Sequence, residues 1–192
     1  MAITINGNGT VTGISVGGLP DGIVDTDMLA ANAVTAAKRG AGAILQVVNA
    51  VYSAAASFTT SGSTFQDTGL TASITSSNSN KILVTYQLEC SAEPNYRHAC
   101  RLVRGSTDIL LANSDGDRIR ATNSNGNPPN NVRMSSFSQT YLDSPGAGTH
   151  TYKLMGWAES NGDFFINRSE SNSDSASHAR GVSTITLMEV AA

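Results

Sequence analysis

After residue 42 the sequence is a succession of short β-like segments separated by turn dipeptides, and this pattern limits the fold more than any other feature. Apolar and polar residues alternate within several segments, so that Ile82, Val84 and Tyr86 share one strand face. Asp115-Gly116 and Asn161-Gly162 are typical turn signals. No helical periodicity intervenes, which argues against a parallel βαβ sheet. About ten strands spaced about ten residues apart predict an antiparallel β-sandwich of the jelly-roll type.

The predicted strands cover residues 43–53, 63–68, 70–75, 81–90, 98–104, 108–113, 118–122, 132–142, 150–159, 163–169 and 181–190.

Two long polar segments, ATNSNGNPPNN at 121–131 and RSESNSDSASHARG at 168–181, are predicted to be loops at the ends of the sandwich. Loops on a rigid β scaffold often carry recognition, although solvation alone would also explain this composition. Asn side chains near aromatic rings would suit sugar hydroxyls. The candidate contact residues are therefore Tyr96, Asn125, Asn127, Asn130 and Trp157.

The polar residues of the chain are mostly uncharged, which suits strands and turns better than a helical bundle. Ser, Thr and Asn make up 59 of the 192 residues, whereas only 14% are charged. The net charge of −3 disfavours nucleic acid as the main partner, because phosphate binding needs a basic surface. No apolar run is long enough to insert into a membrane, and no secretory signal is visible in MAITINGNGTVTG.

No motif in the chain indicates catalysis. Residues 13–17 match the G-x-S-x-G pattern of hydrolases, but the flanking strand and helix that such a turn needs are missing from the sequence. His98, His150 and His178 are scattered, and Asp115-Gly116-Asp117 lacks the distal Glu of a calcium loop. We therefore expect no enzyme activity, no cofactor and no metal site.

Cys90 and Cys100 flank a predicted hairpin loop. They could form a disulfide across adjacent strands, or they could be two free, partly buried thiols.

Arginines cluster in the middle of the sequence, with candidate partners at Glu89, Glu93, Asp115 and Asp117. Three interpretations stay open: solvated surface charge, an ion network within or between subunits, and binding of an acidic glycan or phosphate. The arginines concerned are Arg97, Arg101, Arg104, Arg118, Arg120 and Arg133.

Residues 1–42 are predicted to form an extended arm with a short helix. The stretches AITI and TVTGISV resemble thin strands broken by the turn signal Asn6-Gly7, and the helix would run through Met28, Leu29 and Ala33. The arm has too few large apolar residues to fold alone. We therefore expect another chain to hold it.

The arm sequence, ITINGNGTVTGISVGGLPDGIVDTDMLAANAVTAAK, resembles the N-terminal segments of tail-fibre and related virion proteins of bacteriophages. In these proteins a T-I-N-G-x-G-T-(V/I)-T-G opening leads to L-P-D-G and then to an A-V-T-x-A-K repeat, which AVTAAK at 33–38 matches. The segments ILQVV (44–48), YLDSPG (141–146) and STITLMEV (183–190) are similar to parts of their head domains. The resemblance covers most of the chain and is stronger at both ends.

The resemblance implies a homotrimer in which three arms wind together and carry a head of three jelly rolls, similar in shape to tumour necrosis factor. Residues 1–42 would then be the arm for virion attachment and trimerisation, and residues 43–192 the head. Virion attachment is assigned to Ile3, Ile5, Val11, Ile14 and Val16, and trimerisation to Met28, Leu29, Ala33 and Val34.

We therefore expect a non-enzymatic structural protein of a phage virion, assembled in the host cytoplasm. It would be a short fibre whose arm binds other virion proteins and whose head touches a host-surface glycan. The first alternative is a decoration or cement trimer on the capsid, which copy number per particle would distinguish. The second is a soluble carbohydrate-binding module, for which glycan binding by an isolated monomer would be the sign.

Overall fold

The computed structural model describes residues 4–5, 11–12, 33–34, 38–77, 79–125 and 130–192. The chain divides into a unit Met1–Arg39 and a unit Gly40–Ala192. In the first unit, strands β1 (Thr4–Ile5) and β2 (Val11–Thr12) pair antiparallel, with Ile5 opposite Val11. These pairs lie within the thin strands predicted for the arm.

Several sequence predictions fall outside the described residues. They are the short helix and the assigned residues Ile3, Ile14, Val16, Met28, Leu29 and Asn127. Of the residues assigned to trimerisation, Ala33 and Val34 are described, and Val34 is exposed.

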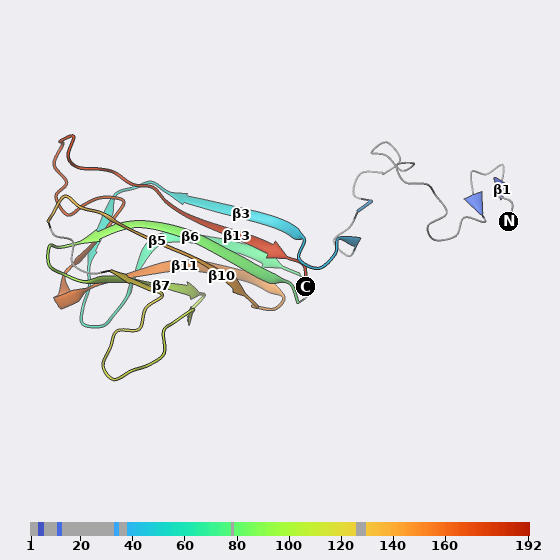
Figure 1. The fold of residues 1–192 in the computed structure, drawn as a ribbon, viewed down its shortest axis with the longest axis horizontal. Helices are drawn as coiled ribbons and strands as arrows, with labels where there is room; N and C mark the ends of the chain where they lie inside the picture. Colours follow the sequence, from blue (N-terminus) through green and yellow to red (C-terminus); the bar gives the residue numbers. More distant parts are fainter. Residues whose placement is uncertain (1–3, 6–10, 13–32, 35–37, 78, 126–129) are drawn as a thin grey trace. The chain divides into compact units, whose positions relative to one another are not determined.

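The second unit is mainly β, and its two antiparallel sheets pack as a sandwich, which confirms the predicted sandwich (Figure 1). In the described part of the chain no helix is long and apolar enough to cross a membrane. The strands of the first sheet are β3 (Ile44–Tyr52), β4 (Ala56–Thr59), β6 (Lys81–Ala92), β10 (Ser135–Asp143), β12 (Asp163–Ile166) and β13 (Ser183–Val190). Those of the second are β5 (Gln66–Ser76), β7 (His98–Arg104), β8 (Thr107–Ile109), β9 (Asn123–Asn125) and β11 (Gly148–Ala158).

In the first sheet, β12 and β13 lie end to end along the same edge of β6. We call such a shared strand position a lane. Strand β12 pairs with the end of β6 (Ile166 opposite Cys90), and β13 pairs with the rest of it (Thr184 opposite Gln87). Both run antiparallel to β6, and β10 occupies its other edge. Outside this lane, β4 pairs with β12 and β3 with β13. The chain therefore leaves the lane after β12, makes an excursion and returns to the same lane as β13.

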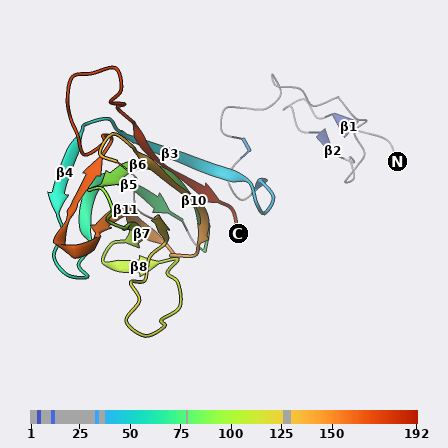
Figure 2. The same cartoon turned by 60° about the vertical axis from the view of Figure 1, so that its left-hand side comes forward.

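The second sheet repeats this arrangement. Strands β8 and β9 both pair antiparallel with β7, with Ile109 opposite Leu102 and Asn123 opposite Cys100. Between them residues 110–122 stand away from the strands, as Figures 1 and 2 show. Leu110 leaves the lane with a φ of 54°. Strands β11 and β5 complete the sheet beyond β7.

The core lies between the sheets and follows the alternation predicted from the sequence. On β6, Ile82, Val84 and Tyr86 are at most 2% exposed, as expected for one shared face. Tyr152 and Leu154 of β11 are fully buried opposite them. Burial of these apolar surfaces is the main stabilising term of the sandwich.

Some strand predictions are wrong. The segment 118–122 forms no strand, and the strand expected at 108–113 ends at Ile109, because Leu110 turns the chain out of the lane with a left-handed backbone conformation. Residues 66–68 of the predicted strand 63–68 join the predicted strand 70–75 in one strand, β5, whose Gly69 adopts a φ of 82° without ending the ladder, whereas residues 63–65 precede β5. The short strand β4 has no counterpart among the predicted strands.

Asn167 fixes the point at which the lane of β12 and β13 is interrupted. Its backbone has a φ of 56°, and the residue is 1% exposed. Its Nδ2 donates to the carbonyl oxygens of Tyr52 (2.7 Å) and Ala54 (3.0 Å), and its Oδ1 accepts from the Ser183 hydroxyl (2.7 Å). One side chain thus connects the β3–β4 junction to both parts of the interrupted lane. Both polar atoms of its amide group are hydrogen-bonded.

Replacing Asn167 with Ala is expected to lower the free energy of unfolding by about 3 kcal/mol, because the carbonyls of Tyr52 and Ala54 and the buried Ser183 hydroxyl lose their partner. Asn113→Ala is the matched control, since Asn113 is exposed in the 110–122 excursion. Urea denaturation followed by circular dichroism measures both. If the free energy of unfolding falls as little as in the control, the chain between β12 and β13 is held in place without this side chain.

Glu189 closes the opposite end of the first sheet. Its Oε1 accepts hydrogen bonds from the Ser77 amide (2.8 Å), the Ser77 hydroxyl (2.9 Å) and Asn80 Nδ2 (2.8 Å). Burial alone would raise the pKa of Glu189, but the bonds from Asn80 and Ser77 outweigh it and the pKa lies below 4.5. The carboxylate form therefore stabilises the fold.

Glu189→Gln is expected to destabilise the protein at pH 7 by about 1–2 kcal/mol, because hydrogen bonds to a charged acceptor are lost. Since the folded-state pKa is depressed, the contribution is complete above pH 4.5 and disappears as the pH falls through the folded-state value. The difference between variant and wild type should therefore shrink in denaturation curves taken at decreasing pH. Buried His98 titrates in both proteins and cancels in the difference. A constant difference down to pH 2 would contradict this role of the carboxylate.

Candidate functional site

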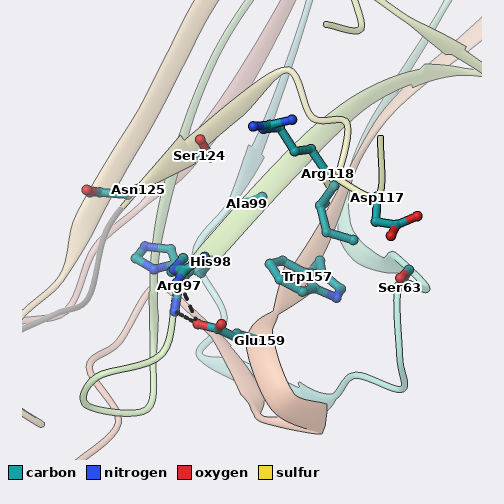
Figure 3. Close-up of a pocket in the computed structure, with 11 residues that line it drawn as sticks. Ser63, Arg97, His98, Ala99, Asp117, Arg118, Ser124, Asn125, Trp157 and Glu159 are labelled. Carbon is teal, nitrogen blue, oxygen red and sulfur yellow. Dashed lines mark hydrogen bonds and ion pairs between the residues drawn. The ribbon is translucent and has the colours of Figure 1, made fainter. Parts of the chain in front are cut away.

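A cavity of about 900 Å³ opens on the outer face of the second sheet (Figure 3). It lies at the start of β7, beside the ends of β9 and β11. The 110–122 excursion forms part of its wall. Its polar lining consists of Ser63, Arg97, His98, Asp117, Arg118, Ser124, Asn125 and Glu159. We refer to it as the Trp157 cavity, because that ring lies in the middle of these side chains.

The alternation of β11 turns Trp157 outward. Tyr152 and Leu154 face the core, so Met155 and Trp157 lie on the other face of the strand. The Trp157 Nε1 donates to the Gly62 carbonyl oxygen (2.7 Å), and the ring stacks on Phe65 with centroids 6.2 Å apart. The residue keeps a 9% exposed surface. The indole is therefore held in one orientation and has its polar atom satisfied.

The excursion is tied to the sheet at its base. Ile119 and Ala121 pack on the small apolar cluster formed by Ala99, Trp157 and Phe65. The Arg101 guanidinium donates to the Arg120 carbonyl oxygen, and that of Arg120 donates to Ala112, both at 2.8 Å. These bonds hold the wall of the cavity against the strands.

Charges of both signs line the cavity in equal number. Arg97 pairs with Glu159 at 3.6 Å, and the Arg97 backbone amide also donates to Glu159 Oε2. Arg118 pairs with Asp115 at 2.8 Å. Asp117 is exposed and has no ion-pair partner within the described ranges. Figure 3 shows Arg118 with Asp117 on one side of the Trp157 ring and Arg97 with Glu159 on the other.

The structure brings together two of the five residues predicted to contact sugar, Asn125 and Trp157. Tyr96 is not among the lining residues and packs closely on Gly162 and against the core. Asn130 is exposed and accepts a bond from the Val132 amide.

Sequence reasoning did not place Glu159, Ser63 or Asp117 at this site, and it had identified Arg97 and Arg118 only as part of an arginine cluster. Arg97 and Glu159 lie far apart in the sequence, and no local pattern signals their pairing. The turn Asn161-Gly162 gave the one available signal, because it follows Trp157 and Glu159 and marks a strand end.

Two other arginines of the cluster, Arg101 and Arg104, have acidic partners within the chain. Arg101 pairs with Asp108 at 3.0 Å, and its guanidinium lies 4.0 Å above the Phe65 ring. Arg104 pairs with buried Asp143, which also accepts a bond from Tyr152. An ion network within the subunit therefore accounts for much of the cluster.

Cys90 and Cys100 are both free and buried. The segment between them is not a hairpin, because β6 and β7 belong to different sheets. The alternative of a disulfide across adjacent strands is therefore wrong, and the alternative of two free thiols is confirmed. Burial raises the pKa of Cys100 to about 12 and that of Cys90 well above its usual value, so both are held as neutral thiols.

His98 belongs to the core side of the same strand. Its ring packs on Phe137 (centroids 5.3 Å apart) and Phe164 (6.3 Å). Neither ring nitrogen has a hydrogen-bond partner in the described structure, and burial lowers the pKa of His98 to about 4. The imidazole is therefore neutral at pH 7.

Among the described residues, no group of three or more His, Cys, Asp or Glu side chains is arranged to hold a metal ion. Comparison with protein-family models and with curated proteins finds no match for the chain. The cavity and the surfaces of the sandwich therefore have to be interpreted from their own chemistry.

Proposed function

We propose that the chain is a non-enzymatic structural protein of a phage virion, a short trimeric fibre whose N-terminal arm docks on the particle and whose head contacts the host surface. The arm sequence and the segments at 44–48, 141–146 and 183–190 support this through their resemblance to tail-fibre proteins. The observation that carries the self-association is an exposed apolar row on the first sheet.

The head would be a jelly roll of the tumour-necrosis-factor type. Counting β3 with β4, β12 with β13, and β8 with β9 as single lanes, the lanes alternate between the two sheets along the chain except at one step, from β7 to β8. The first sheet then has the order β3, β13, β6, β10, and the second the order β5, β11, β7, β8. This is the order that two interleaved Greek keys give, and jelly rolls recur in viral capsid and lectin domains.

The apolar row crosses the outer face of the first sheet from one edge to the other. The strand register aligns Val47, Met188, Leu83 and Leu142 side by side. Val47 is 56% exposed and Leu142 is 44% exposed. Thr186, Thr85 and their neighbours form the adjoining row, and it carries no charge. An uncharged apolar strip of this kind fits a second copy of the same chain, because identical surfaces meet there without like-charge repulsion.

The outer face of the second sheet has the opposite character. It carries the ion pairs Arg101–Asp108 and Lys153–Asp67 and the Trp157 cavity. If the first sheet faces the other subunits, this charged face and its excursion are turned to the surroundings. The cavity would then be available to a host-surface ligand.

The full chain is expected to have a native mass near three times 19.9 kDa in sedimentation. Val47→Asp should shift it towards the monomer without changing the circular dichroism, because a buried unpaired carboxylate costs several kcal/mol at an interface. Ser73→Asp adds the same charge at an exposed position of β5, in the other sheet, and should leave the native mass unchanged. A wild-type monomer would refute the trimer and favour the soluble carbohydrate-binding module. A trimer that survives Val47→Asp would move the interface away from this row.

Removing residues 1–22 is expected to leave a folded head that no longer enters virus particles, because the arm supplies the docking segment. Virus particles are assembled with the full-length or the truncated chain and purified, and mass spectrometry measures how much of the chain they contain. The copy number of the full chain in the same particles separates a fibre, present in few copies, from a capsid decoration. Normal incorporation of the truncated chain would contradict the docking role.

A further inference from the structure

We infer that the Trp157 cavity binds an uncharged glycan. This assigns a ligand class to the host-surface contact proposed above, and it rests on that proposal only for its biological setting. The inference itself depends on the lining residues, their charges and the position of the indole ring.

The lining combines the two features that sugars need. The Trp157 ring supplies an apolar aromatic surface, which matches the C–H face of a pyranose ring. Around it, the arginines donate hydrogen bonds and the carboxylates of Asp117 and Glu159 accept them. Each sugar hydroxyl both donates and accepts, so neighbouring hydroxyls match neighbouring donors and acceptors.

The balance of charge favours a neutral sugar over an acidic one. Arg97 is already paired with Glu159, and Arg118 with Asp115. An anionic sugar would therefore meet guanidinium groups that each already have a carboxylate partner, and it would lie close to the unpaired carboxylate of Asp117. A hydroxyl group has no such penalty and can donate to that carboxylate.

The volume of about 900 Å³ lies within the range of small-molecule sites and leaves room for more than one sugar ring. Asn125 and Ser124, both exposed on β9, extend the polar lining away from the indole. The structure thus provides one aromatic subsite and a polar continuation from it.

Trp157 is the only tryptophan of the chain, so its fluorescence reports directly on the cavity. We would titrate the full-length protein with maltotriose, mannotriose and N-acetyllactosamine, and with sialyllactose as the acidic probe. A saturable change with at least one neutral probe, and a weaker one with sialyllactose, is expected. Asp117→Ala should weaken the neutral probe about tenfold, which corresponds to one lost charged hydrogen bond. Asp174→Ala, at an exposed position of the serine-rich excursion, should bind as wild type does.

No response to any neutral probe, or a response that Asp117→Ala leaves unchanged, would overturn the inference. Tighter binding of sialyllactose would also overturn it and would assign the site to an acidic glycan through the arginines. The native mass of the same samples is measured in parallel. A trimer that binds no sugar would refute the glycan site and leave the proposed fibre standing. A monomer that binds sugar would refute the fibre and leave the glycan site standing.

Discussion

Strand β6 is the element on which both sheets of the sandwich depend. It is paired along both edges, with β10 on one side and β12 and β13 on the other, so its backbone hydrogen bonds are satisfied inside the protein. Its inward-facing side chains, every second residue from Ile82 to Ala92, form part of the core against which the second sheet packs. The same alternation sends Leu83 and Thr85 to the outer face. The core and the proposed association surface are therefore two faces of one strand.

The two outer faces divide the work expected of a fibre head. The face of the first sheet carries Val47, Leu83 and a row of threonines, and it is the face that we propose contacts other copies of the chain. The face of the second sheet carries paired charges and an aromatic ring in a cavity, which suits a polar ligand. In a closed ring of copies, one face would bind neighbours while the other stays accessible. This difference between the two faces is the structural basis of the proposed fibre head.

Much of the architecture could be predicted from the sequence, because it depends on local alternation. Strand β7 was predicted with its observed ends, and the shared inward face of Ile82, Val84 and Tyr86 was correct. The excursion at 110–122 could not be foreseen, since apolar residues such as Leu110 and Ile119 occur in it and the departure depends on one left-handed residue. Of the candidate site, Trp157 and Asn125 were accessible to composition and loop arguments. Glu159 required the fold, because it acts through Arg97, from a distant part of the chain.

Each interrupted lane has a consequence for how such a surface can change over time. The ladder beside β6 constrains only where the chain leaves, at Asn167, and where it returns, at Ser183. The ladder beside β7 likewise holds the return at Thr122, whose hydroxyl accepts from the Leu102 amide. Beyond the anchored bases of the two excursions, exposed residues can be inserted, deleted or replaced at a cost that grows slowly with loop length, and the register of the strands stays the same. The chain thus has two places where the residues of the surface can change while the fold stays the same.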